Sequence, residues 1–122
     1  IILLLSLTVS SQTYKYIGIE EGLSNQKIYK IQKDARGYMW FLTHVGIDQY
    51  NGKEIKHYKL REGNRELDPL LNLNWTFLDK TGTLLVTGKQ GRIFRYNSGH
   101  DRFVQIYSMY NYWNKDYHAF VR

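Results

Sequence analysis

Histidines and carboxylates are the residues best able to do chemistry in this chain, and their spacing does not indicate a catalytic or metal centre. Four histidines are present, and none stands at metal-ligand spacing from another: His44, His57, His100 and His118. The carboxylates show no pairing of the kind that a glycoside hydrolase needs: Glu20, Glu21, Asp48 and Glu54. The chain has no Cys, which removes thiol nucleophiles and thiolate zinc sites. We therefore predict no catalytic residue, no metal site and no cofactor in this chain.

The charge balance is basic, with 17 Lys and Arg against 11 Asp and Glu and a formal net charge of +6. Basic clusters can bind nucleic acid or an anionic surface. Here the basic residues are scattered, and in segments 27–33 and 53–58 they alternate with apolar residues. Such alternation is typical of a strand with one face in water. We therefore expect this chain to bind no nucleic acid.

One aromatic stretch near the C-terminal end, residues 107–114, leaves two interpretations open. Its aromatic rings beside Asn could stack on a sugar and hydrogen-bond to it, or they could pack on the core between two repeats. The sequence therefore does not identify the ligand-binding residues.

The residues that could position a site belong to an internal repeat of about 45 residues. The segment that begins at Ile28 matches the segment that begins at Leu73. The shared residues define a repeat signature: Asp34, Gly37, Trp40, Thr43, Gly46, Tyr50 and Gly52 in the first copy, and Asp79, Gly82, Gly91 and Tyr96 in the second. Leu85 stands where the first copy has Trp40.

Each copy has the same order of strands and turns. An apolar strand leads into Asp-x-x-Gly, in which Asp caps a tight turn and Gly supplies its positive φ. A second, strongly apolar strand follows, then a Gly-containing turn, a third strand, and a turn such as Asn51-Gly52 that favours a hairpin. A fourth, alternating strand completes the copy. The apolar residues of the second strand, Trp40 among them, are expected to pack between neighbouring copies.

Four antiparallel strands in about 45 residues are typical of one β-propeller blade. The sequence therefore predicts an all-β fold, a β-propeller fragment of about two four-stranded antiparallel blades. We expect an N-terminal strand and opening motif at 12–26, blade 1 at 27–60, an inter-blade loop at 61–72 and blade 2 at 73–107. Residues 108–122 would form a connection and the start of a third blade.

The two ends of the sequence predict a fragment of an exported protein. An apolar run followed by small residues indicates the remnant of a signal peptide at 1–11, with cleavage between Ser11 and Gln12. The run is too short for a membrane-spanning helix, and the alternative is a buried strand. The other end stops in strand-like sequence at Arg122.

At these motifs the chain resembles the two-component regulator propeller family. The match runs through Glu21-Gly22-Leu23-Ser24, then the Asp34–Trp40 stretch, Thr43, and Gly46 to Gly52. The second copy is degenerate, since Leu85 replaces Trp. The resemblance covers roughly residues 14–106, and the Gly-Leu-Ser motif follows the signal peptide almost at once.

The resemblance implies a larger protein, the periplasmic ectodomain of an inner-membrane hybrid histidine kinase of Bacteroidetes type. It implies a signal-transducing sensor with an oligosaccharide ligand, a downstream membrane helix and a homodimer when full length. This fragment would not itself be an enzyme, because kinase motifs would lie in the missing part. The alternatives are an exported binding or scaffolding propeller without a kinase, and a fragment of a propeller lyase or glycosidase.

Overall fold

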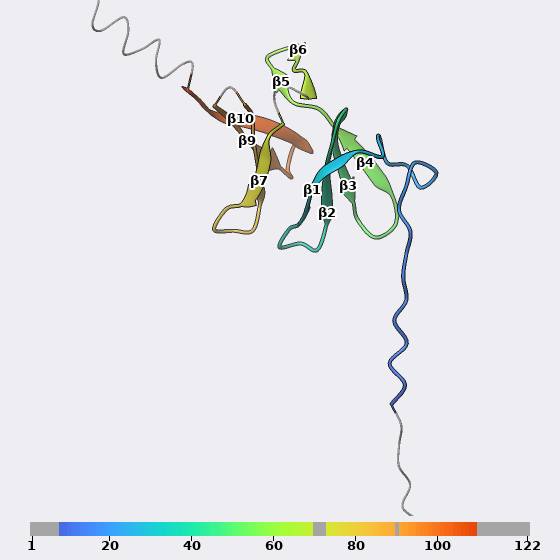
Figure 1. Cartoon of the computed structure of the whole chain (residues 1–122). Coiled ribbons are helices and arrows are strands. Elements are labelled where there is room, and N and C mark those ends of the chain that lie inside the picture. Colours follow the sequence, from blue (N-terminus) through green and yellow to red (C-terminus); the bar gives the residue numbers. More distant parts are fainter. Residues whose placement is uncertain (1–7, 70–72, 90, 110–122) are drawn as a thin grey trace, which may run out of the picture.

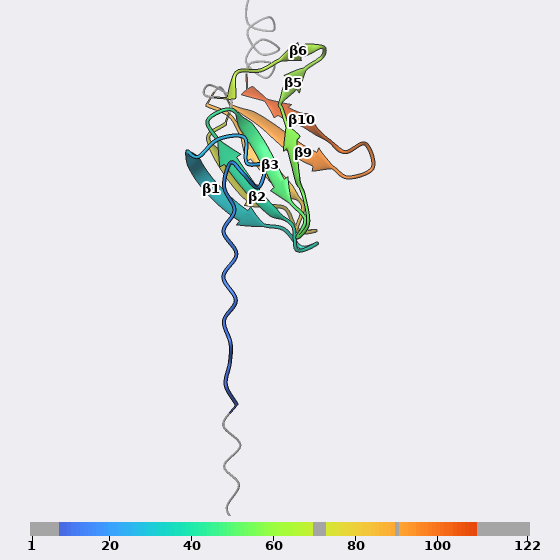
Figure 2. The ribbon, with the colours of Figure 1, turned by 90° about the vertical axis from the view of Figure 1, so that its right-hand side faces the viewer.

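The computed structural model describes residues 8–69, 73–89 and 91–109. The predictions for the first seven residues of the signal peptide and for the tail beyond residue 109 lie outside these ranges. Residues 8–16 are exposed and run away from the body of the molecule as an extended segment (Figures 1 and 2).

The first sheet is a four-stranded antiparallel meander that the first repeat forms. Its strands pair in chain order: β1 (Ile28–Lys33), β2 (Met39–Thr43), β3 (Gly46–Tyr50) and β4 (Ile55–Tyr58). The turn between β1 and β2 is the predicted Asp-x-x-Gly turn. The Asp34 Oδ1 atom accepts hydrogen bonds from the backbone N–H groups of Arg36 and Tyr38, and Gly37 takes the positive φ.

The second sheet repeats this arrangement with β7 (Trp75–Leu78), β8 (Leu84–Thr87), β9 (Arg92–Asn97) and β10 (Arg102–Ser108). The Asp79 Oδ1 atom caps its first turn by accepting from the N–H groups of Thr81 and Thr83. The last strand differs from its counterpart, since β10 has seven residues against four in β4 and carries a bulge between Gln105 and Tyr107.

The segment predicted as an inter-blade loop, 61–72, contains a short hairpin. Its strands are β5 (Arg61–Glu62) and β6 (Arg65–Glu66), and an Arg65–Glu62 ion pair spans the turn. The hairpin projects beyond the two sheets on the side of β10 (Figures 1 and 2). Residues 61–66 contain no apolar side chain, so the alternation that predicts a strand is absent from this segment.

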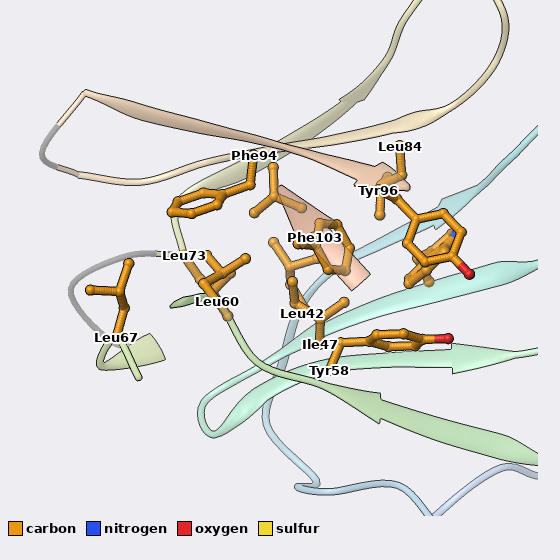
Figure 3. Packing of buried hydrophobic residues seen from close by; sticks show 12 residues of the cluster. Leu42, Ile47, Tyr58, Leu60, Leu67, Leu73, Leu84, Phe94, Tyr96 and Phe103 are labelled. Carbon is orange, nitrogen blue, oxygen red and sulfur yellow. The ribbon is translucent and has the colours of Figure 1, made fainter. Parts of the chain in front are cut away.

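The two sheets pack face to face, and one core lies between them. Each sheet has a front face and a back face. The front face of the first sheet lies against the back face of the second. The front face of the first sheet carries Trp40, Leu42, Ile47 and Tyr58, and the back face of the second carries Leu84, Val86, Phe94, Tyr96 and Phe103. Figure 3 labels most of these side chains and shows that Leu42, Ile47 and Tyr58 lie across from Leu84, Phe94, Tyr96 and Phe103.

Trp40 is the centre of this core and is fully buried. Its ring lies 4.8 Å from the Tyr96 ring and 5.6 Å from the Phe103 ring, both in edge-on geometry. The predictions of an all-β fold and of two four-stranded antiparallel meanders are confirmed, and Trp40 packs between the repeats as expected. Assembly into a propeller stays a prediction.

Candidate functional site

The two Asp-x-x-Gly turns lie side by side at one end of the packed sheets. The Ala35 N–H donates a hydrogen bond to the Gly82 carbonyl oxygen at 3.1 Å, which joins the turns directly. Gly82 has φ +75°, and a Cβ placed on it would lie 2.2 Å from the Ala35 Cβ. Glycine is therefore needed at position 82 both for the turn conformation and for the close approach of the repeats.

Beside these turns lies a hollow of about 200 Å³. Eight residues with polar side chains, from both repeats, line it: Asp34, Arg36, Thr81, Thr83, Arg95, Tyr96, Asn97 and Ser98. They offer guanidinium, amide and hydroxyl groups within one small concave surface. Such groups suit a hydroxylated or weakly charged ligand held by several hydrogen bonds.

The two turn carboxylates are fully used by the fold. The Asp34 Oδ2 atom accepts a hydrogen bond from the Trp40 indole N–H at 2.9 Å. The Asp79 Oδ2 atom accepts instead from Arg95 Nε at 2.8 Å. Hydrogen bonds from Thr81 and then Arg95 hold the pKa of Asp79 well below its ordinary value. Neither carboxylate has the freedom that a general acid or base needs.

A second polar contact joins the two sheets at the edge of the aromatic core, where Asp101 is half exposed. The hydroxyl groups of Tyr58 and Tyr96 both donate to the Asp101 Oδ1 atom at 2.7 Å. Asp101 lies in the β9–β10 turn with φ +49°. We call this three-residue contact between the sheets the tyrosine clamp.

The tyrosine clamp shifts the pKa of each of its members. Burial, followed by the hydrogen bond to Asp101, raises the pKa of Tyr58 far above its ordinary value and also raises the pKa of Tyr96. The two phenol hydroxyls, Tyr58 first, lower the pKa of Asp101. The clamp therefore needs a carboxylate and two neutral phenols at the same time.

Ser24, Asp48 and His57 form a cluster on the opposite side of the first sheet, its back face. Asp48 is fully buried, and it accepts hydrogen bonds from the Ser24 N–H at 2.7 Å and the Ser24 hydroxyl at 2.5 Å. His57 Nδ1 lies 2.7 Å from both Asp48 Oδ1 and Ser24 Oγ. A catalytic triad uses different ring nitrogens for the serine and the carboxylate. The cluster therefore anchors the Gly18–Ser24 segment and does not form a nucleophile.

The sequence signature did not reveal this cluster. In the sequence, Asp48 has no evident partner, and His57 belongs to segment 53–58, whose alternation predicts a strand with one face in water. One signal was present, because Asp48 aligns with Phe94 of the second repeat, a residue that is buried in the core. A charged residue at a buried position of a repeat predicts a dedicated polar partner.

The predicted signature residues lie at turns and at the junction of the repeats. Thr43 Oγ1 donates to the Gly46 carbonyl at 3.0 Å, and Tyr96 belongs to the tyrosine clamp. Five signature glycines have positive φ: Gly37, Gly46, Gly52, Gly82 and Gly91. Their roles are structural, and the hollow beside the two turns is formed largely by residues outside the signature.

Within the described ranges, no group of three His, Cys, Asp or Glu residues is placed to hold a metal ion. In the same part of the chain, no helix is long and apolar enough to cross a membrane. Of the aromatic stretch 107–114, only the first three residues are described, and Tyr107 is exposed on the side of the second sheet that faces away from the first.

Comparison with known proteins adds no further constraint. No protein-family model matches the chain, and no curated protein matches it. The features that bear on function are therefore the repeat, the two joined turns and the polar hollow beside them.

Proposed function

We propose that this chain is part of the extracytoplasmic β-propeller sensor of a two-component histidine kinase, and that its polar hollow contacts a glycan-derived ligand. The observation that carries the proposal is the pair of joined Asp-x-x-Gly turns with the hollow beside them. Repeated turns on packed sheets give a rigid platform whose loops can hold a ligand without reorganisation.

The chemistry of the hollow favours binding over catalysis. Asp34 lines the hollow, but its carboxylate is committed to Trp40 and to backbone N–H groups. Two Arg side chains, together with Thr, Asn and Ser side chains, supply most of the remaining polar groups. A sugar presents several hydroxyl groups in a small volume, which such a surface can recognise.

The sensor assignment draws on the order of features in the sequence. An apolar run at the start precedes Glu21-Gly22-Leu23-Ser24, and the repeat with Trp40 follows. The structure gives Ser24 a role that is consistent with a fixed opening motif, because its backbone and its hydroxyl both bind the buried Asp48. On this proposal the protein is periplasmic, is anchored through a downstream membrane helix and signals as a homodimer.

Calorimetry on the intact ectodomain, expressed from the complete gene, tests the proposal. We would titrate it with a panel of neutral and acidic oligosaccharides and repeat the titration with Ser98→Ala and Arg36→Ala in the hollow. Arg102→Ala, which does not line the hollow, is the matched control. We expect the hollow variants to weaken binding about ten-fold and the control to leave it unchanged.

Two results would overturn the proposal. If the complete gene encodes neither a membrane helix nor a kinase or other output domain, the protein is a scaffolding propeller. If an oligosaccharide binds but the hollow variants do not change its affinity, the ligand site lies elsewhere in the ectodomain.

A further inference from the structure

The side of the second sheet that faces away from the first, its own front face, carries a row of exposed apolar side chains. Trp75 is 54% exposed, Phe77 40%, Val104 38% and Tyr107 43%. Strand pairing places them on one side, since Phe77 lies opposite Leu85, and Val104 lies opposite Arg95. Apolar groups gathered over several strands of one sheet face are typical of an interaction surface.

The first sheet supplies a template for what covers such a face. Its front face carries the cross-strand pair Ile47 and Tyr58, which the second sheet covers. The corresponding pair in the second sheet is Ile93 and Tyr107. Tyr107 is therefore the counterpart of Tyr58. The β10 bulge and the longer preceding turn hide this relation in the sequence, because they change the spacing from the repeat period.

If Tyr107 is covered as Tyr58 is, its hydroxyl needs a hydrogen-bond partner. The Tyr58 hydroxyl is held by Asp101, a carboxylate from the last hairpin turn of the covering sheet. Among the described residues, no hydrogen-bond partner is found for the Tyr107 hydroxyl. Covering Tyr107 without a partner for its hydroxyl would leave a buried polar group unsatisfied.

We propose that the front face of the second sheet docks a further four-stranded antiparallel sheet of the same repeat type. This sheet presents branched and aromatic apolar residues to Trp75 and Phe77, and a carboxylate from its last hairpin turn to the Tyr107 hydroxyl. The inference rests on the repeat architecture of the proposed function, but it does not depend on the ligand.

A second copy of this chain does not fit as the occupant. The face that would match, the back face of the second sheet, is already packed against the first sheet in each copy. The other outward face, the back of the first sheet, is covered over Asp48 by the Gly18–Ser24 segment. The occupant must therefore come from another repeat.

Hydroxyl-radical footprinting on the intact protein, compared with the 122-residue chain, tests the docking directly. In the intact protein we expect Trp75 and Tyr107 to be oxidised as slowly as the buried Trp40 and Tyr58, and in the short chain much faster than these two. Tyr14, in the exposed N-terminal segment, should react at the same rate in both proteins and serves as the control.

Tyr107→Phe in the intact protein tests the carboxylate. We expect it to lower the folding equilibrium constant about ten-fold, as loss of one buried hydrogen bond does. Tyr14→Phe is the matched control and should change nothing. A Tyr107→Phe variant as stable as the parent protein would remove the carboxylate from the proposal.

Equal oxidation of Trp75 and Tyr107 in both proteins would overturn the docking, whatever the outcome with oligosaccharides. Protection that develops in the short chain as its concentration rises would assign the face to a second copy and overturn the proposal as stated. Docking without oligosaccharide binding would leave this inference standing while the sensor proposal fails.

Discussion

The two repeats solve the same structural problem with different residues. In the first repeat, the turn carboxylate Asp34 is satisfied by Trp40 on the second strand. In the second repeat, Leu85 stands at the position of Trp40, and Asp79 is satisfied by Arg95, which lies directly opposite Leu85 on the third strand. Both repeats therefore have a hydrogen bond to the turn carboxylate, but the donor is on the second strand in one repeat and on the third strand in the other.

The large aromatic side chains of the front face also lie on different strands in the two repeats. In the first sheet, β1 presents Lys30 and Gln32 beside the large Trp40 of β2. In the second sheet, β7 presents Trp75 and Phe77, and β8 carries the smaller Leu85. A degenerate repeat can therefore keep its capped turn and its apolar face without keeping the signature residue, because neighbouring strands exchange roles.

Replacing Trp40 by Ala should be the most damaging single change in this comparison. It removes a fully buried ring from the inter-sheet core and leaves Asp34 Oδ2 without its donor. We expect a loss of about 3–5 kcal/mol in the free energy of unfolding, measured by urea denaturation. Leu85 is also buried, at 7% exposure, but it lies outside the inter-sheet cluster, so Leu85→Ala should cost less, about 2–3 kcal/mol. Equal losses would show that the two positions are equivalent after all.

Removing the carboxylate of Asp48 should break the attachment of the Gly18–Ser24 segment. Asp48→Ala leaves the Ser24 N–H, the Ser24 hydroxyl and His57 without their shared acceptor. We expect a cost of about 1–3 kcal/mol and faster proteolysis between residues 18 and 27. Phe94→Leu, at the corresponding position of the second repeat, should lower stability without exposing that segment. Unchanged proteolysis in Asp48→Ala would show that other contacts hold the segment.

Much of the fold followed from the sequence because turn chemistry is local. The 45-residue period, the Asp-x-x-Gly turns and Asn51-Gly52 predicted the number and order of the strands in both sheets. The repeat period and the turn motifs do not predict the contacts between the sheets. Asp101 binds Tyr58 from 43 residues away, and Ser24 binds Asp48 from 24 residues away. Such pairs depend on how the sheets and the N-terminal segment pack, which a repeat period does not encode.

The tyrosine clamp should make stability depend on pH at both ends of the scale. The folded pKa of Asp101 is lowered, so its contribution is present above the ordinary carboxyl pKa of about 4 and is lost as the pH falls below it. The folded pKa of Tyr58 is raised, so its contribution is lost as the pH rises above the ordinary phenol pKa of about 10.

Tyr58→Phe tests the clamp through this pH dependence. We expect it to cost about 1 kcal/mol at neutral pH and to flatten the alkaline loss of stability, measured by thermal unfolding across pH. Tyr29→Phe, at a half-exposed tyrosine outside the clamp, is the matched control and should leave the profile unchanged. Because the pKa of Tyr96 is also raised, part of the alkaline loss should remain; a loss that is undiminished in Tyr58→Phe would show that Tyr58 does not contribute to it.

The smallest expected effect comes from converting the second repeat toward the first. Arg95→Gln introduces the residue that the first repeat carries at this position, Gln49, but leaves Leu85 in place of Trp. Asp79 then keeps the hydrogen bonds from Thr81 and Thr83 and loses the one from Arg95. Because the Arg95–Asp79 pair is partly exposed to water, the change should have little effect on stability. The clearer measurement is the pKa of Asp79, which should rise toward its ordinary value in an NMR titration of the carboxyl carbon.

Adding Leu85→Trp to Arg95→Gln offers an indole donor in place of the guanidinium, although the docking face must then accommodate a larger ring. If the double variant brings the pKa of Asp79 back down, the exchange of donors between the second and third strands is a sufficient account of how the two repeats differ at this turn. If the pKa stays raised, the path of the second turn differs from that of the first in a way that the donor alone does not explain.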